Sequence, residues 1–245
     1  MARGFDGVDQ RLTATPTPVT APPFTMACWF RPENDTDNQV LMGSSTGTVI
    51  AADRHLLQLR GDVAGDPLSI NSQDGPTTGY VETTTGITPN TWHHACGVFA
   101  ASNSRSVYLD AGGKATDTTE VTPDDLVLWS IGCQYRADAP TRRLHFTGRI
   151  AEAAVWNVAL TDVEVAILAA GYSPTFVRPA SIVAYWPLIR LLPGMWGDTY
   201  PLSAENSPPA EAHAPILYPY GYVTSGRVGA ALATLRTLAT LGAGR

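Results

Sequence analysis

The stretch FTGRIAEAAVWNVALTDVEV, residues 146–165, decides the fold. Its first half, up to Trp156, is rich in apolar residues and predicts a strand. Thr161 and Glu164 then have the spacing of a capping box, in which each side chain bonds the backbone N–H of the other residue. The stretch therefore predicts a strand that runs directly into one short helix near residues 161–169.

Short strands are expected along most of the chain before and after this joint. Apolar runs alternate with turns rich in Gly, Asp, Asn and Pro, and they recur every 8–12 residues or so, as in a sandwich or jelly roll. In residues 24–30 both faces are apolar, which is typical of a strand inside a sandwich. The predicted strands are 24–30, 39–43, 47–52, 55–60, 67–71, 78–83, 91–100, 106–113 with residues 110–113 as its hairpin turn, 126–133 and 181–188.

Composition agrees with an all-β protein. The 245 residues are 44% hydrophobic and only 16% charged, with 22 Gly and 19 Pro, a mixture that favours strands and turns over helices. The net charge of −6 and the absence of a basic patch argue against a nucleic-acid partner. No apolar run reaches the roughly 18 residues of a membrane span, so no membrane association is expected.

The three cysteines and the amino terminus both suggest a reducing compartment. Cys28, Cys96 and Cys133 are odd in number, widely spaced, and each lies in a strand-like run, so they are expected to be buried free thiols. The opening MARGFDGVDQ has no apolar signal-peptide core. The protein is therefore expected to be made and retained in a cytoplasm unless lysis or assembly releases it.

The amino-acid composition of the chain changes near residue 190. Residues 191–224 are rich in Pro and Gly and predict an irregular wrapping segment, in which 207–216 could end in a closing edge strand. Residues 225–245 form a tail rich in Ala and Leu that predicts a C-terminal helix with a broad apolar face. The expected organisation is a jelly roll over residues 1–190, the wrapping segment, and the helical tail.

Five motifs in order resemble one known family. FTMACWFRP, TWHHACGVF, SVYLDAGG, IGCQY and the stretch at 146–165 follow the order and spacing of laminin-G-like domains, in the concanavalin A-like lectin/glucanase superfamily. The resemblance covers residues 4–190 and implies an all-β, two-sheet antiparallel jelly-roll sandwich. The opening FDGVDQ and the later YWPL also resemble the version of this domain found in tailed-phage virion proteins.

Catalysis is not expected. The glucanases of this superfamily carry E-x-D-x-x-E or E-x-D-x-E on one strand, where alternate carboxylates share a face, and no such run occurs here. No nucleophile-elbow signature is present either. Arg60-Gly61-Asp62 spells an integrin tripeptide, which we interpret as chance.

No cofactor is expected, but calcium stays open because many laminin-G-like domains bind it. Two acidic loops carry oxygen ligands that suit this ion, and the alternative interpretation is that both are solvated turns. Adjacent histidines cannot chelate together from a strand, so the Trp-His-His motif is expected to pack and hydrogen-bond. The residues concerned are Asp35, Asp37 and Asn38, Asp6 and Asp9, and His93 and His94.

Two functional hypotheses follow. The first is a non-catalytic phage virion protein, a capsid decoration, cement or fibre-associated subunit, located in the virion. It would form a homo-oligomer, with a trimer as our guess, and bind the major capsid or other virion proteins by burying apolar area. The contact face would be Leu232, Leu235 and Leu238, unless the tail helix docks on its own sandwich.

The second hypothesis is a lectin-like adhesion module that binds carbohydrate, such as a host-surface glycan, with or without calcium. Such sites stack aromatic rings on sugar rings and bind sugar hydroxyls with Asp and Asn. The aromatic residues available in the carboxyl-terminal part are Trp196, Tyr200, Tyr218, Tyr220 and Tyr222.

Overall fold

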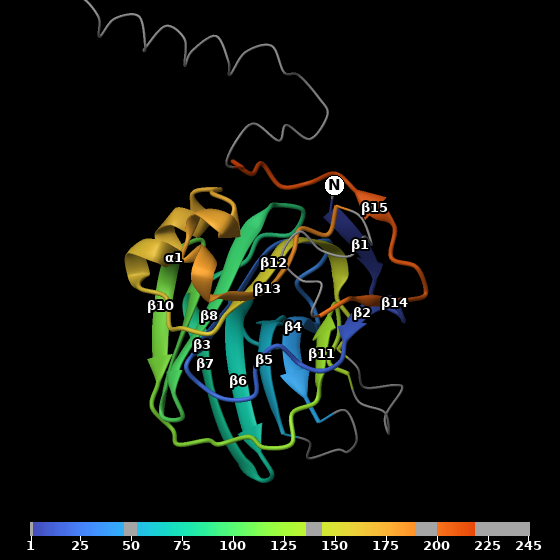
Figure 1. Cartoon of the computed structure of the whole chain (residues 1–245). Coiled ribbons are helices and arrows are strands. Elements are labelled where there is room, and N and C mark those ends of the chain that lie inside the picture. Colours follow the sequence, from blue (N-terminus) through green and yellow to red (C-terminus); the bar gives the residue numbers. More distant parts are fainter. Residues whose placement is uncertain (1, 47–52, 136–143, 190–199, 219–245) are drawn as a thin grey trace, which may run out of the picture.

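The computed structural model describes residues 2–46, 53–135, 144–189 and 200–218. Two antiparallel sheets stack into a sandwich, so the predicted all-β jelly-roll architecture is confirmed (Figure 1). Sheet A has eight strands in the order β10-β9-β8-β3-β12-β1-β15, with β13 paired to β12. Its strands are β1 (Ala2–Asp6), β3 (Phe24–Pro32), β8 (His93–Ala101), β9 (Ser104–Leu109), β10 (Gly112–Asp117), β12 (Thr147–Trp156), β13 (Ile182–Trp186) and β15 (Ala210–Glu211).

Sheet B has seven strands in the order β14-β2-β11-β4-β5-β6-β7. Its strands are β2 (Arg11–Ala14), β4 (Asn38–Ser45), β5 (Arg54–Arg60), β6 (Pro67–Asp74), β7 (Thr77–Gly86), β11 (Leu128–Ile131) and β14 (Ser203–Glu205). The largest part of the core lies between the sheets, where the rings of Phe24 and Phe99 stack with centroids 4.3 Å apart. Fully burying side chains of this size contributes about 1.5–3 kcal/mol each.

A second apolar cluster covers the other face of sheet A. It joins Trp156 and Tyr185 of that sheet to Val165 and Leu168 of helix α1 (Asp162–Ala169). Two short 3-10 helices, η1 (Pro174–Phe176) and η2 (Pro179–Ser181), follow α1 in the same layer. Figure 1 shows these helices beside β8 and β10, at one side of the sandwich. Sheet A is therefore a middle layer, which explains why β3 and β12 are apolar on both faces.

The predicted joint between a strand and a helix is confirmed. β12 ends at Trp156, and α1 begins after Thr161, which has extended backbone angles. The Thr161 N–H donates to Glu164 Oε2 at 2.8 Å, and the Glu164 N–H donates to Thr161 Oγ1 at 3.4 Å. Both halves of the capping box are thus present, and they fix where the helix starts.

The hairpin turn predicted within residues 106–113 is confirmed, although its last two residues, Gly112 and Gly113, already belong to the next strand. β9 ends at Leu109, and a new strand, β10, begins at Gly112. Asp110 and Ala111 between them have φ of 52° and 61°, so they form the tight turn of a hairpin. The polar alternation of β10 hid this strand, because it lies at the edge of sheet A and carries no wholly apolar face.

The predicted wrapping segment contributes to both sheets where it is described. β14 pairs with β2 in sheet B, and β15 pairs with β1 as an edge of sheet A, inside the region expected to form a closing strand. The division of the chain at residue 190 stays a prediction. The predicted strand at 47–52 and the predicted C-terminal helix at 225–245 lie outside the described residues.

Cys28, Cys96 and Cys133 are all buried, as expected. Among the described residues, no helix has both the length and the apolar character needed to cross a membrane.

Candidate functional site

The outer face of sheet B is the face that α1 leaves uncovered, and three of its strands make it polar. In β5, β6 and β7, Leu57, Ile70 and Val81 point into the core, so the alternate residues point outward. Apart from Leu56, the outward residues along the centre of these strands are polar. We call this surface the polar face: Arg54, Gln58 and Arg60 of β5, Ser69, Asn71 and Gln73 of β6, and Thr78, Tyr80 and Glu82 of β7.

An aromatic ring is exposed at the β7 side of the polar face. Tyr80 is 54% exposed, and the Arg60 guanidinium lies 5.9 Å from its ring centroid. Arg60 Nη1 lies 3.0 Å from Glu82 Oε1, and Arg60 Nε donates to Asp62 Oδ1 at 2.8 Å. The hydrogen bond to Asp62 raises the pKa of Arg60, and the same bond lowers the pKa of Asp62. The ring therefore stands beside a fixed cluster of charges.

The centre of the polar face holds amide and hydroxyl groups. Arg54 Nε donates to Asn71 Oδ1 at 3.2 Å, and the Gln73 amide donates to the Gly75 carbonyl at 2.8 Å. Ser69 Oγ is buried and has no hydrogen-bond partner among the described residues. A buried hydroxyl without a partner costs free energy, so this part of the face lacks a hydrogen bond that would stabilise it.

Tyr135 limits the polar face on its β4 side. The Ser45 hydroxyl, at the outer side of β4, donates to the Tyr135 carbonyl at 3.4 Å. The Arg11 guanidinium, from β2, lies 5.5 Å from the centroid of the Tyr135 ring. Tyr135 therefore borders the face on this side. Since Gln58, Ser69 and Asn71 are buried, the accessible part of the polar face is Thr78, Tyr80 and Glu82 of β7 with the partly exposed Arg54, Arg60 and Gln73.

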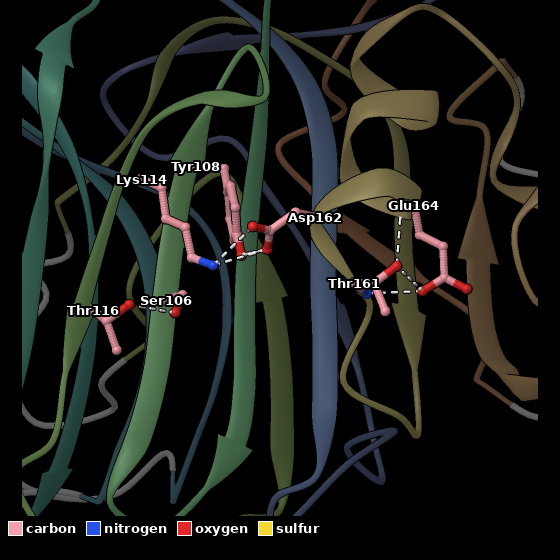
Figure 2. A network of polar contacts seen from close by, with 7 residues as sticks. All are labelled: Ser106, Tyr108, Lys114, Thr116, Thr161, Asp162 and Glu164. Atoms are coloured by element: carbon pink, nitrogen blue, oxygen red, sulfur yellow. Dashed lines mark hydrogen bonds and ion pairs between the residues drawn. The ribbon is translucent and has the colours of Figure 1, made fainter.

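A second polar cluster fastens α1 to sheet A. Tyr108 Oη and Lys114 Nζ each lie 2.8 Å from Asp162 Oδ1, and Figure 2 shows both side chains reaching the start of the helix from the sheet. The lysine holds the pKa of Asp162 below its usual value, with Tyr108 as the second cause. These contacts satisfy one another, so we assign the cluster a structural role.

The two histidines of the Trp-His-His motif point to opposite faces of sheet A, as expected. His93 packs beside Phe30, and His94 packs beside Trp29. His93 Nδ1 lies 2.7 Å from Asp110 Oδ2, and Asp110 Oδ1 accepts the His94 N–H at 2.7 Å. The motif therefore holds the β9–β10 turn against the start of β8.

One of the two acidic loops named for calcium, the one with Asp6 and Asp9, is a hydrogen-bonded turn. Asp6 Oδ1 accepts the backbone N–H groups of Val8 at 2.9 Å and of Asp9 at 3.2 Å, which is the bonding of a turn residue. In the part of the chain that the structure describes, no group of three His, Cys, Asp or Glu side chains could hold a metal ion. Calcium binding stays an untested expectation.

Of the five aromatic residues named for sugar stacking, two lie among the described residues. Tyr200 packs against the core, and Tyr218 donates a hydrogen bond to buried Glu152. Trp196, Tyr220 and Tyr222, and the proposed contact residues Leu232, Leu235 and Leu238, lie outside the described residues. Tyr80 was not among the residues predicted from the sequence, although the alternation of Thr78, Tyr80 and Glu82 in a predicted strand indicates an outward polar face.

Known proteins share this fold at low identity. A Bacteroides ovatus protein described as a candidate carbohydrate-binding protein matches with a TM-score of 0.55 at 19% identity, over 76% of this chain and 50% of that one. The CBM40 domain of a Ruminococcus gnavus IT-sialidase, bound to α2,3 sialyllactose, has a TM-score of 0.55 at 14% identity, over 68% of this chain and 96% of its own.

A third solved structure is domain 4 of the GH43 extracellular arabinanase AbnA from Geobacillus stearothermophilus, in complex with arabinotriose. It has a TM-score of 0.52 at 19% identity, over 69% of this chain and 76% of that one. This chain thus spans about half the length of the Bacteroides ovatus protein and most of the other two. At these identities the likeness shows the fold alone.

No curated protein matches the chain. A family model for the concanavalin A-like lectin/glucanases superfamily matches residues 6–166, which is more than half of the chain. That span runs from the end of β1 into α1 and includes all of the polar face. The chain therefore belongs to the concanavalin A-like lectin/glucanases superfamily.

Proposed function

We propose that this protein is a non-catalytic carbohydrate-binding module and that its polar face holds the ligand. The observation that carries the proposal is Tyr80, a tyrosine ring 54% exposed among amide, hydroxyl and charged side chains of three adjacent strands. The apolar face of a sugar ring packs on an aromatic ring, and its hydroxyls bond with amides and carboxylates. The polar face offers both kinds of contact.

The solved structures of the same fold support this choice over a purely structural role. Two of them hold carbohydrate: sialyllactose on the CBM40 domain and arabinotriose on the arabinanase domain. The virion role stays a prediction, because its contact residues, Leu232, Leu235 and Leu238, lie outside the described residues. Glycan binding is compatible with a place on a virion.

The proposal includes no chemical step. Asp62, just after the end of β5, and Glu82 of β7 both bind Arg60. A glycosidase needs one carboxylic acid with a raised pKa to protonate the leaving group, whereas the hydrogen bond from Arg60 lowers the pKa of Asp62. This pair is therefore suited to accept sugar hydroxyls rather than to cleave a glycosidic bond.

A glycan array tests the proposal with three forms of the full chain. Wild type should bind a defined set of glycans, and Tyr80→Ala should lose about two- to tenfold in affinity, because an aromatic stacking contact is worth about 0.5–1.5 kcal/mol. Tyr172→Ala is the matched control, since Tyr172 is also exposed (40%) but stands after α1, away from sheet B. Absence of any bound glycan, or equal loss in both variants, would refute the proposal.

A further inference from the structure

One guanidinium lies between two carboxylates on the polar face, so its charge is paired and one negative charge is in excess. Arg60 Nε lies 2.8 Å from Asp62 Oδ1, Arg60 Nη2 lies 3.2 Å from Asp62 Oδ2, and Arg60 Nη1 lies 3.0 Å from Glu82 Oε1. All three guanidinium nitrogens therefore face carboxylate oxygens. The Arg60 side chain is also mostly covered, with 21% of its surface exposed, so it is not free to turn toward a ligand.

Recognition of an acidic sugar requires the opposite arrangement. A sugar carboxylate or sulfate is bound best by a guanidinium whose paired N–H groups point at the ligand. On this face three of the five Arg60 N–H donors already meet carboxylate oxygens, and Arg54 already donates its Nε hydrogen to Asn71. The side chains of Asp62 and Glu82 are 49% and 25% exposed, so their carboxylates would repel the negative charge of a ligand anion.

The same groups suit an uncharged sugar. Carboxylate oxygens accept sugar hydroxyl donors, and charge-assisted hydrogen bonds are roughly twice as strong as neutral ones. Gln73 is partly exposed and Thr78 is exposed, and their amide and hydroxyl groups offer both donors and acceptors. With the exposed ring of Tyr80, the face matches a ligand that has hydroxyl groups and no charge.

We propose that the polar face selects neutral oligosaccharides and excludes acidic ones. This inference rests on the proposed function and specifies its ligand class. It also separates this chain from the CBM40 domain of the same fold, which binds sialyllactose, an acidic glycan.

Titration calorimetry with the full chain tests the selection. The neutral probes are lactose and arabinotriose, and the acidic probes are sialyllactose and trigalacturonate, each at 50 and 500 mM NaCl. We expect a neutral probe to bind with less than a twofold change in affinity between the two salt concentrations, because no ligand charge is screened. We expect each acidic probe to bind at least tenfold more weakly.

A variant pair tests whether the internal ion pairs cause the selection. Asp62→Asn combined with Glu82→Gln releases Arg60, so affinity for sialyllactose or trigalacturonate should rise at least tenfold at 50 mM NaCl and fall again at 500 mM. Asp9→Asn combined with Glu33→Gln is the matched control, since both residues are exposed and lie off the polar face. The control should leave the preference for neutral probes unchanged.

Three outcomes would overturn the inference. Wild type binding only acidic probes, with strong salt dependence, would refute the neutral preference while the proposed carbohydrate-binding function stands. An unchanged preference in the Asp62→Asn, Glu82→Gln variant would refute the role of Arg60. Binding of no carbohydrate at all on the array would refute the proposed function, and the inference would fall with it.

Discussion

At the scale of single residues, Asp110 connects a hairpin turn to the Trp-His-His motif. Its carboxylate meets His93 Nδ1 at 2.7 Å and accepts the His94 N–H. Burial opposes the charge on both groups, yet their hydrogen bond prevails, so the pKa of His93 is raised and the pKa of Asp110 is lowered. The pair therefore links the stability of the β8–β10 region to pH.

Asp110→Asn should cost most stability near pH 5. Below the unfolded-state pKa of about 6.5, His93 is protonated in both states and the ion pair contributes fully; that contribution disappears as pH rises through the higher folded-state pKa. Above about pH 4, Asp110 is ionised in both states. Because Asp110 is half exposed, the cost at pH 5 should exceed that at pH 8.5 by only about 0.5–1 kcal/mol. Urea unfolding of both proteins between pH 5 and pH 8.5 measures this difference. A loss of unfolding free energy that does not change with pH would contradict the prediction.

Glu152 is a buried acid that a bulge in β12 turns toward the carboxyl-terminal segment. Its backbone has φ of 54°, and its two oxygens accept the Tyr185 and Tyr218 hydroxyls at 2.5 Å. His213 Nε2 lies 3.0 Å from Oε1 without hydrogen-bond geometry. Burial, followed by the charge of Glu152, raises the pKa of both tyrosines, so they stay protonated as donors.

Glu152→Gln should lower the free energy of unfolding by about 1–3 kcal/mol, because an amide cannot accept at both positions and leaves a buried donor without a good partner. Glu211→Gln is the control, since Glu211 forms a partly exposed ion pair with Arg149 that is worth at most about 1 kcal/mol. Chemical unfolding measures both. Equal losses of unfolding free energy in the two variants would contradict the stabilising role of buried Glu152.

At the scale of elements, the capping box of α1 is the clearest local signal in the sequence. Thr161→Ala removes the side-chain acceptor of the Glu164 N–H and should cost about 1 kcal/mol. Thr161→Ser keeps the hydroxyl and should cost less than half of that. Thermal unfolding compares the two, and an Ala variant as stable as the Ser variant would contradict the role of the cap.

The elements that could be predicted are those whose own residues carry a clear apolar or helix-capping pattern. β3 and β12 are apolar on both faces because sheet A is covered on both sides, and α1 has its cap in the sequence. β2, β10 and β14 were missed because they are short or polar strands, at or next to a sheet edge. Their pairing depends on strands far away in the chain, and no local pattern encodes it.

At the scale of the whole molecule, the fold could be predicted but the candidate site could not. Ordered motifs indicated two sheets, yet they did not show that α1 would cover sheet A and leave sheet B open. Tyr80 becomes a candidate only when β5, β6 and β7 align their outward residues. The contact of Arg60 with Glu82, which reaches from β5 across β6 to β7, likewise follows from strand register rather than from spacing in the sequence.

The central claim is that the outer face of β5, β6 and β7 is where carbohydrate binds. The most direct measurement is an NMR titration of the ¹⁵N-labelled full chain with a neutral oligosaccharide that binds on the array. The account predicts that the largest amide shifts fall within residues 54–60, 69–73 and 78–82, and that Tyr80→Ala reduces them. Shifts confined to sheet A or to the α1 layer, with those three strands unchanged, would contradict it.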